Sequence, residues 1–233
     1  LSVDTLAYKS QKFKPIIGTI HRHKTKSIYE GADFYSGGIV IDLPAERRRI
    51  TDLERVEPNF CIKKNGDIEV FVEIKTIFGI IIKTILVSAH SEEISLNYRF
   101  IDWKKMIGSV RLGVMTLLND FSREDTKISF SNGGELDEEF NFSGKVLHTA
   151  PASTLVSSSM GIGATTGSIL VKNNEKKLCL KWDPSEAAVM PMLQNIPSSN
   201  GALSRIFFSL KEFDDTVKVP TKMCGHSFTI STI

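Results

Sequence analysis

The stretch Ile94-Ser-Leu-Asn-Tyr-Arg-Phe100 alternates large apolar residues with polar ones. A period of two is typical of a β-strand with one buried face and one wet face. The same alternation recurs in Val70–Lys75. Phe60–Lys63 precedes that strand across Asn65-Gly66, a dipeptide that readily takes the positive φ angles of a tight turn. The sequence therefore predicts a β-hairpin here.

Short apolar runs of this kind recur along the whole chain. A second hairpin is predicted from Ser168–Lys172 and Leu178–Trp182. Further strands are predicted at Gly38–Asp42, Ile80–Val87, Gly113–Leu118, Thr126–Phe130, Glu139–Phe142, Thr154–Ser157, Ile206–Lys211 and Ser227–Ile233. Helical signals are confined to Asp183–Met190, which Pro191 would end, and to one turn at Ala45–Arg49. This pattern predicts an all-β fold, a large antiparallel β-sandwich with at most one or two short helices.

Composition narrows the class of protein. Of 233 residues, 41% are hydrophobic and 24% are charged, as in ordinary globular domains, and we expect residues 1–233 to form a single domain. The net charge of +2 gives no electrostatic case for a nucleic-acid or acidic-membrane partner. The longest apolar run, Ile77–Val87, is too short to span a bilayer. Three scattered cysteines make neither a disulfide framework nor a zinc pattern, so we expect a cytoplasmic protein without metal or cofactor.

Two motifs suggest ligands, but each has a simpler interpretation. Gly161–Gly167 is glycine-rich like a phosphate loop, yet a phosphate loop needs a following helix, and a strand is predicted to follow here. A turn between strands is therefore favoured. His21 and His23 share one face of a strand and could bind a metal, but the neighbouring Arg22 and Lys24 oppose a cation. A solvated basic strand is the better interpretation.

Catalytic motifs are weak. The neighbouring carboxylates Glu92-Glu93, Glu138-Glu139 and Asp214-Asp215 point to opposite faces of a strand, so none of these pairs forms the geometry that glycoside hydrolysis uses. The run Ser157–Gly161 lacks the glycine of a nucleophile elbow. Cys224 lies near His226 in sequence, but a packed core cysteine is the more common outcome.

A sugar site is the ligand site that the residue chemistry favours. Rings cover the C–H faces of a pyranose, and planar polar groups bind its hydroxyls. Residues of both kinds flank the predicted loops: Tyr29, Phe34, Tyr35, Trp103, Asn132 and Trp182. We expect Arg111, Asn132, Glu139 and Trp103 to approach one another on a concave sheet surface and to bind sugar there. The alternative is that Arg111 forms a salt bridge with Glu139 or another acid inside the sheet layer.

Several segments together resemble a known domain. They are Tyr29–Gly38, Arg49–Leu53, Gly108–Gly113, Ser131–Glu135, Gly161–Gly167 and Phe208–Thr216. In this order they are similar to the carboxyl-terminal β-domain of some glycoside hydrolase family 57 proteins. That domain resembles the galactose-mutarotase-like supersandwich, which is also found in family 38 α-mannosidases. The resemblance spans roughly residues 29 to 216.

The resemblance implies two large antiparallel sheets and a carbohydrate context. In such enzymes the catalytic carboxylates belong to a separate barrel, so no catalytic residue carries over to this chain. The expected function is that of a non-catalytic accessory domain of a glycoside hydrolase. It would pack against the catalytic domain of the same polypeptide and bind an oligosaccharide. Leu1 in place of Met agrees with a piece of a longer protein.

A stand-alone enzyme is the rival interpretation. A sugar mutarotase or epimerase needs a general acid and a general base astride the sugar ring. The conceivable partners are His90 or His148 with Glu73 or Glu139, although neither histidine lies in a recognisable motif. A third possibility is a structural or partner-binding sandwich without a sugar role. The sequence leaves open the sugar, its linkage and the oligomeric state.

Overall fold

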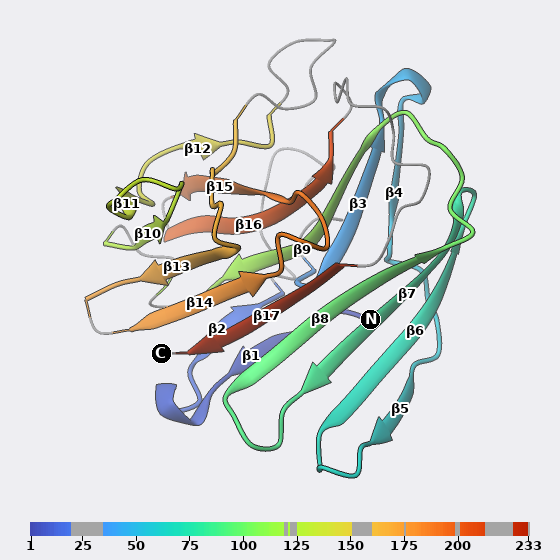
Figure 1. Ribbon diagram of the computed structural model, residues 1–233, viewed down its shortest axis with the longest axis horizontal. Helices are drawn as coiled ribbons and strands as arrows, with labels where there is room; N and C mark the ends of the chain where they lie inside the picture. Colours follow the sequence, from blue (N-terminus) through green and yellow to red (C-terminus); the bar gives the residue numbers. More distant parts are fainter. Residues whose placement is uncertain are drawn as a thin grey trace.

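The computed structural model describes residues 1–19, 35–118, 121, 125–150, 160–174, 176–198, 201–212 and 226–232. These residues form two antiparallel sheets that face each other (Figure 1). The eight-stranded sheet consists of β1 (Thr5–Ala7), β2 (Pro15–Gly18), β3 (Gly38–Leu43), β4 (Arg48–Thr51), β9 (Ser109–Leu117), β12 (Val146–Leu147), β15 (Met190–Ser198) and β16 (Gly201–Lys211). The nine-stranded sheet consists of β5 (Asn59–Ile62), β6 (Ile68–Thr76), β7 (Gly79–Val87), β8 (Glu93–Ile101), β10 (Lys127–Phe130), β11 (Glu138–Asn141), β13 (Ser168–Lys172), β14 (Lys177–Trp182) and β17 (His226–Thr232). The predicted antiparallel β-sandwich is confirmed.

The strand order brings distant parts of the sequence together. The nine-stranded sheet runs β11-β10-β13-β14-β17-β8-β7-β6-β5, so the last strand lies between β14 and β8. The central path of the eight-stranded sheet is β1-β2-β9-β16-β15-β12, and β3 and β4 extend from β9. One continuous hydrophobic core fills the space between the sheets. In β8 the core residues are Ile94, Leu96, Tyr98 and Phe100, as the alternation predicts.

The hairpin predictions are confirmed. β5 pairs with β6 across Asn65-Gly66, and Gly66 has a φ of +88°, a conformation that glycine adopts without a steric penalty. β13 pairs with β14 in the second hairpin. The predicted strand Thr154–Ser157 lies outside the described residues.

The helix prediction at Asp183–Met190 is wrong. The chain makes only a turn there, closed by the bond from the Glu186 amide to the Asp183 carbonyl, and β15 begins at Met190. β15 accommodates Pro191 and Pro197 because β12 pairs with it only at Gln194 and Asn195, so that both prolines lie where β15 is an edge strand, and the sequence pattern gave no strand for it. Over the described ranges the helical segments are two 3-10 turns, Lys9–Gln11 and Pro44–Glu46. No helix in the part of the chain described here is long and apolar enough to cross a bilayer.

A buried ion pair joins the two sheets. Lys83 on β7 donates to the carboxylate of Asp52, which follows β4, and the two side chains are 0% and 4% exposed. Oδ1 of Asp52 also accepts the Ile39 amide at 3.0 Å. Burial lowers the pKa of the Lys83 ammonium group, and the neighbouring Asp52 carboxylate opposes that shift. Each charge is therefore stabilised inside the core by the other, and the Leu1 carbonyl, which accepts from Lys83, and the Ile39 amide add one hydrogen bond to each partner.

Removal of one partner of this pair is expected to destabilise the protein strongly. Asp52→Ala leaves an uncompensated ammonium group in the core and lowers the free energy of unfolding by about 3–5 kcal/mol. The double variant Asp52→Leu with Lys83→Met removes both charges and recovers most of the loss. Urea denaturation of the wild type and these variants measures both effects. Equal destabilisation by the single and double variants would contradict the pairing.

A buried histidine closes one end of the core. His226 on β17 is 1% exposed and packs edge-on against Phe228, with ring centroids 4.6 Å apart. Burial lowers the pKa of its imidazole from 6.5 to about 4, and the Asp183 carboxylate opposes the shift. The Glu186 carboxylate lies 3.7 Å from its Nδ1. The imidazole is therefore neutral in the folded protein at pH 7.

Because the His226 imidazole is buried in its neutral form, the free energy of unfolding is expected to decrease in acid. Between pH 6.5 and about 4 the unfolded chain binds a proton at His226 that the folded chain does not, so stability falls as pH is lowered through that window. The full loss is about 3 kcal/mol, from about 1.4 kcal/mol per pKa unit. His226→Phe removes this loss. Urea denaturation at pH 7, 5.5 and 4 should show a smaller pH dependence in the variant, whereas parallel curves would contradict the assignment.

Candidate functional site

The strand β9 is buried at all nine of its positions, although only one face of a sandwich strand meets the core. Gly113, at a φ of +58°, makes a bulge in the middle of β9, and the register with β16 shifts at the same point. Because of the bulge, the side chains of both Leu112, before it, and Met115, after it, lie in the core. Arg111 and Thr116 then lie on the opposite side of the sheet, called the outer face here.

The outer face carries side chains in three rows that cross β9, β16 and β15. The first row contains Arg111, Ser209 and Met190, the second contains Val114, Phe207 and Met192, and the third contains Thr116, Arg205 and Gln194. The second row belongs to a small apolar cluster that is separate from the main core. An apolar strip thus lies between two rows that contain polar groups.

The third row, called the polar row, contains buried polar atoms. Oγ1 of Thr116 and Oε1 of Gln194 are buried and have no hydrogen-bond partner within the described ranges. Arg205 lies between these two residues and is 1% exposed, with its guanidinium carbon 5.6 Å from the centre of the Phe207 ring. A buried polar atom without a partner costs about 1–3 kcal/mol. Such atoms in one row indicate a place that a polar ligand can complete.

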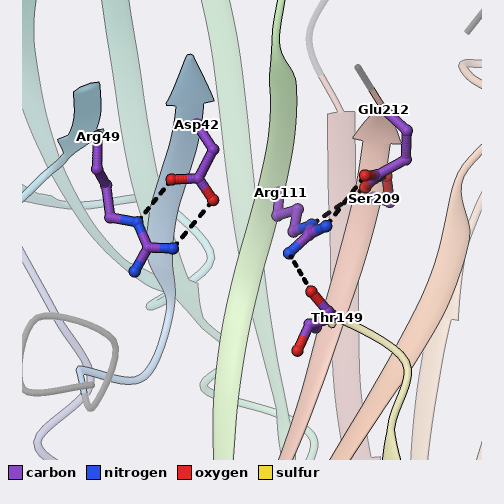
Figure 2. A network of polar contacts seen from close by, with 6 residues as sticks. All are labelled: Asp42, Arg49, Arg111, Thr149, Ser209 and Glu212. Atoms are coloured by element: carbon purple, nitrogen blue, oxygen red, sulfur yellow. Dashed lines mark hydrogen bonds and ion pairs between the residues drawn. The ribbon is translucent and has the colours of Figure 1, made fainter. Parts of the chain in front are cut away.

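Arg111 anchors the first row through a two-pronged salt bridge. Its Nε and Nη2 each donate to Glu212 at 3.0 Å, and Ser209 donates to the same carboxylate at 2.5 Å. Figure 2 shows these groups on one side of the sheet, with Nη1 of Arg111 directed to the Thr149 carbonyl at 3.4 Å. The guanidinium and carboxylate are 8% and 5% exposed. This buried pair holds the segment around Thr149 over the outer face.

A second arginine–carboxylate pair extends the face to its other side. Arg49 on β4 donates to Asp42 on β3 through Nε at 2.6 Å and Nη2 at 3.0 Å (Figure 2). Its side chains are 35% and 23% exposed. It has the same chemistry as the Arg111 pair, but solvent reaches it.

His148 lies at the border of this face, next to Thr149 in sequence. Its amide donates to the Leu193 carbonyl at 3.0 Å, and its Nδ1 accepts the Leu193 amide at 3.2 Å. Burial lowers the pKa of the imidazole. The ring is therefore neutral at pH 7 with its proton on Nε2, because Nδ1 acts as the acceptor.

The sequence-predicted cluster of Arg111, Asn132, Glu139 and Trp103 does not assemble through the contacts of the described residues. Arg111 pairs with Glu212, as the alternative prediction of an acid inside the sheet layer states. The other three residues belong to the nine-stranded sheet or its loops, whereas Arg111 is on β9 of the eight-stranded sheet.

The contacts of these three residues explain their positions. Asn132 donates to Glu138 beside its own turn. Glu139 on β11 is held by Lys172 and Lys127, and their hydrogen bonds lower the pKa of its carboxyl group. Trp103 follows β8 and packs against Phe78 and Phe100, with ring centroids 5.9 and 4.9 Å apart. Trp103 is half-buried in an aromatic cluster, and Glu139 lies at a charged sheet edge.

The histidine–glutamate pairs proposed for a mutarotase are also separated by their contacts. His90 lies in the turn between β7 and β8, where its Nε2 bonds the Asn65 carbonyl. Glu73 is exposed on β6, and the Glu139 carboxylate is engaged with two lysines. His148 bonds Leu193 at the other sheet. The contacts of the described residues bring none of these histidines to either glutamate.

The remaining motifs have structural roles or lie outside the described residues. The glycine-rich segment ends at Gly167, which has a φ of +71°, and β13 begins at Ser168 instead of a helix. His21, His23 and Cys224 lie outside the described residues, as do Tyr29 and Phe34. Among the residues that the structure places, no group of three or more His, Cys, Asp or Glu could hold a metal ion.

The sequence interpretation missed most of the outer face. Arg205, Phe207 and Ser209 alternate with Ile206 and Phe208 in β16, so both faces of this strand carry large side chains. A strand with large side chains on both faces is typically buried on both sides, and this pattern in the sequence could have indicated a covered outer face. Gln194 was missed because Pro191 and Pro197 made a strand over Met190–Ser198 look unfavourable in the sequence.

Comparisons with known proteins add little to this description. No family model matches the chain, and no curated protein matches it. Among solved structures, the chain is similar to an α-galactosidase from Lactobacillus brevis, with a TM-score of 0.45 and 9% sequence identity. The match covers 100% of this chain and 33% of that enzyme, so the chain spans about a third of its length. The particular resemblance to glycoside hydrolase families 57 and 38 stays a prediction.

Burial predicts that the two arginine–carboxylate pairs differ greatly in their effect on stability. Glu212→Ala leaves a buried guanidinium without its carboxylate and costs about 3–5 kcal/mol of unfolding free energy. Asp42→Ala breaks a solvent-exposed pair of the same chemistry and costs about 1 kcal/mol or less. Urea denaturation of both variants measures the difference. Similar losses in the two variants would show that Glu212 does not stabilise a buried charge.

Proposed function

We propose that this chain is a carbohydrate-associated domain that binds an oligosaccharide on the outer face of its eight-stranded sheet. The polar row is the observation that carries the proposal. Thr116, Arg205 and Gln194 carry a hydroxyl, a planar set of donors and an amide, which are the kinds of group that bind sugar hydroxyls. Thr116 and Arg205 are 0% and 1% exposed, so Gln194 is the member of the row that a sugar would reach first. The Phe207 ring in the next row is 5% exposed and packs in the adjoining apolar cluster, so it could cover only part of the C–H face of a pyranose.

Buried polar atoms without a partner occur at several places in the described residues, among them Trp103, Ser109 and His226, and on the outer face Thr116 and Gln194 contribute two of them to one row. Oγ1 of Thr116 and Oε1 of Gln194 destabilise the folded protein as long as they have no hydrogen-bond partner. Binding sites often retain such costly groups because a ligand completes them. Gln194 is the most exposed of the three residues in the polar row, so a ligand would reach the row from its side.

A non-catalytic role agrees best with the acids on this face. Glu212 is fully engaged by Arg111 and Ser209, so its carboxylate is poorly placed to take or give a proton. Asp42 is likewise paired with Arg49. We therefore propose a non-catalytic role. The resemblance of the sequence to glycoside hydrolase domains is what suggests an accessory domain with the catalytic domain of the same polypeptide as its partner, and the scattered cysteines suggest a cytoplasmic location.

Removal of the unpartnered polar atoms is expected to separate binding from stability. Thr116→Val and Gln194→Leu keep the side-chain volume but lose the hydrogen bonds to sugar, so oligosaccharide affinity falls about tenfold or more in each variant. Stability stays constant or rises, because a buried atom without a partner is removed. A glycan array finds the ligand, with maltooligosaccharides and mannosides as the first probes, and calorimetric titration and thermal unfolding measure the variants.

Arg99→Ala is the matched control, because Arg99 is an exposed strand residue of the other sheet. It should leave sugar affinity unchanged. Absence of binding to any glycan, with the intact polypeptide also tested, would refute the proposal. So would unchanged affinity in both polar-row variants. Accelerated interconversion of α-D-glucose or α-D-galactose in a polarimeter would instead support the stand-alone mutarotase.

A further inference from the structure

The nine-stranded sheet ends in two edges of very different chemistry. At one edge β11 carries Glu138 and Glu139, and the salt bridges of Glu139 to Lys127 and Lys172 surround that edge with charge. At the other edge β5 is exposed at all four residues and contains no charged side chain. Proteins usually protect open strand edges with charges, proline or bulges. β5 has none of these within the strand.

A separate strip of exposed apolar side chains, distinct from the apolar row of the outer face, adjoins this open edge. Phe60 and Ile62 on β5 are 73% and 69% exposed, and Ile68 and Val87 beside them are 43% and 41% exposed. The strand registers place all four on the side of the sheet that faces the core farther along β6. The strip is therefore a part of the core-facing side of the nine-stranded sheet that the eight-stranded sheet does not cover. Figure 1 shows β5 at this outer edge.

The backbone pattern shows which groups of β5 point outward. The Lys63 amide donates to the Asp67 carbonyl at 2.8 Å, so these two residues form a hydrogen-bonded pair of the hairpin. Such pairs alternate along an antiparallel ladder. Cys61 and Asn59 are then the residues bonded to β6, and the amides and carbonyls of Phe60 and Ile62 point away from the sheet. The open edge therefore offers two residues for pairing with another strand.

We propose that β5 is a homodimer interface, in which β5 of a second copy pairs with it antiparallel and continues the sheet. The register that uses the outward groups of both copies sets Phe60 opposite the second copy's Ile62 and Ile62 opposite its Phe60. It forms about four backbone hydrogen bonds. The apolar strips of the two copies then meet on the same side of the extended sheet.

Charge favours a second copy in this orientation. The exposed residue Glu57 precedes β5, and two exposed lysines follow it: Lys63, which pairs with Glu69 of its own chain at 2.8 Å, and Lys64. An antiparallel pairing sets the acidic flank of one copy beside the basic flank of the other at both ends. A parallel pairing would bring like charges together, which is destabilising. The segment is thus complementary to itself in the antiparallel direction.

The register also gives Cys61 a specific position. It sets Cys61 opposite the Cys61 of the second copy, at a pair that is not hydrogen-bonded, where the Cα atoms are about 4.5 Å apart. That separation lies within the range of about 4.4–6.8 Å that a disulfide spans. Cys61 is an exposed free cysteine, whereas Cys179 is buried. Cys224 lies outside the described residues, so oxidation reports on the proposed pairing when it is carried out in a Cys224→Ser background.

Sedimentation equilibrium of the 233-residue chain from about 1 to 100 μM tests the dimer. The wild type should reach twice the chain mass of 25.9 kDa. Phe60→Lys and Ile62→Lys should remain monomeric and should unfold at the temperature of the wild type at dilutions where it is a monomer, because both side chains are exposed in the single chain. Leu136→Lys, at a position 83% exposed and away from β5, is the matched control and should still dimerise.

Copper–phenanthroline oxidation tests the register. It should produce a covalent dimer in the Cys224→Ser background and none when Cys61→Ser is added to it. A protein that stays monomeric throughout the concentration range would overturn the proposal, as would a dimer that Ile62→Lys leaves intact. A dimer that forms without a Cys61 crosslink would overturn the assigned register. None of these outcomes depends on the proposed sugar site.

Discussion

The rest of the structure depends on the burial of β9 on both of its faces. One face meets the hydrophobic core, and the Gly113 bulge turns Arg111 and Thr116 to the other. A guanidinium in that position needs a carboxylate, and Glu212 supplies it from the end of β16. The eight-stranded sheet is therefore packed on both of its faces, and its outer face has polar groups of its own.

Two of the buried charges in the described part of the molecule are paired in the same way. Lys83 in the core and Arg111 on the outer face each have a carboxylate partner, and each pair joins segments far apart in the sequence. Such pairs add little net stability compared with apolar packing, but the loss of either partner is costly. Thr116 and Gln194, like Trp103, Ser109 and His226, carry buried polar atoms without a partner, and the position of Thr116 and Gln194 in one row is what motivates the proposed role of the outer face.

Much of the fold could be predicted from the sequence, and little of the site. Strands such as β8, with one wet face, show an alternation that identifies them, and Asn65-Gly66 identifies a hairpin. β15 was missed because the prolines in its sequence suggested a helix end. The partner of Arg111 could not be assigned either, because Glu212 is 101 residues away, and only the pairing of β9 with β16 brings them together. Local patterns determine single strands, whereas the polar row exists only after distant strands have paired.

The central claim is that the outer face of the eight-stranded sheet is the ligand-binding face. Amide hydrogen exchange, measured with and without a saturating oligosaccharide selected on the glycan array, tests this claim most directly. Slower exchange is expected in peptides from β16 and from Val146–Thr149, and unchanged exchange is expected in β6 and β7. Protection confined to the nine-stranded sheet, with β16 unaffected, would contradict it.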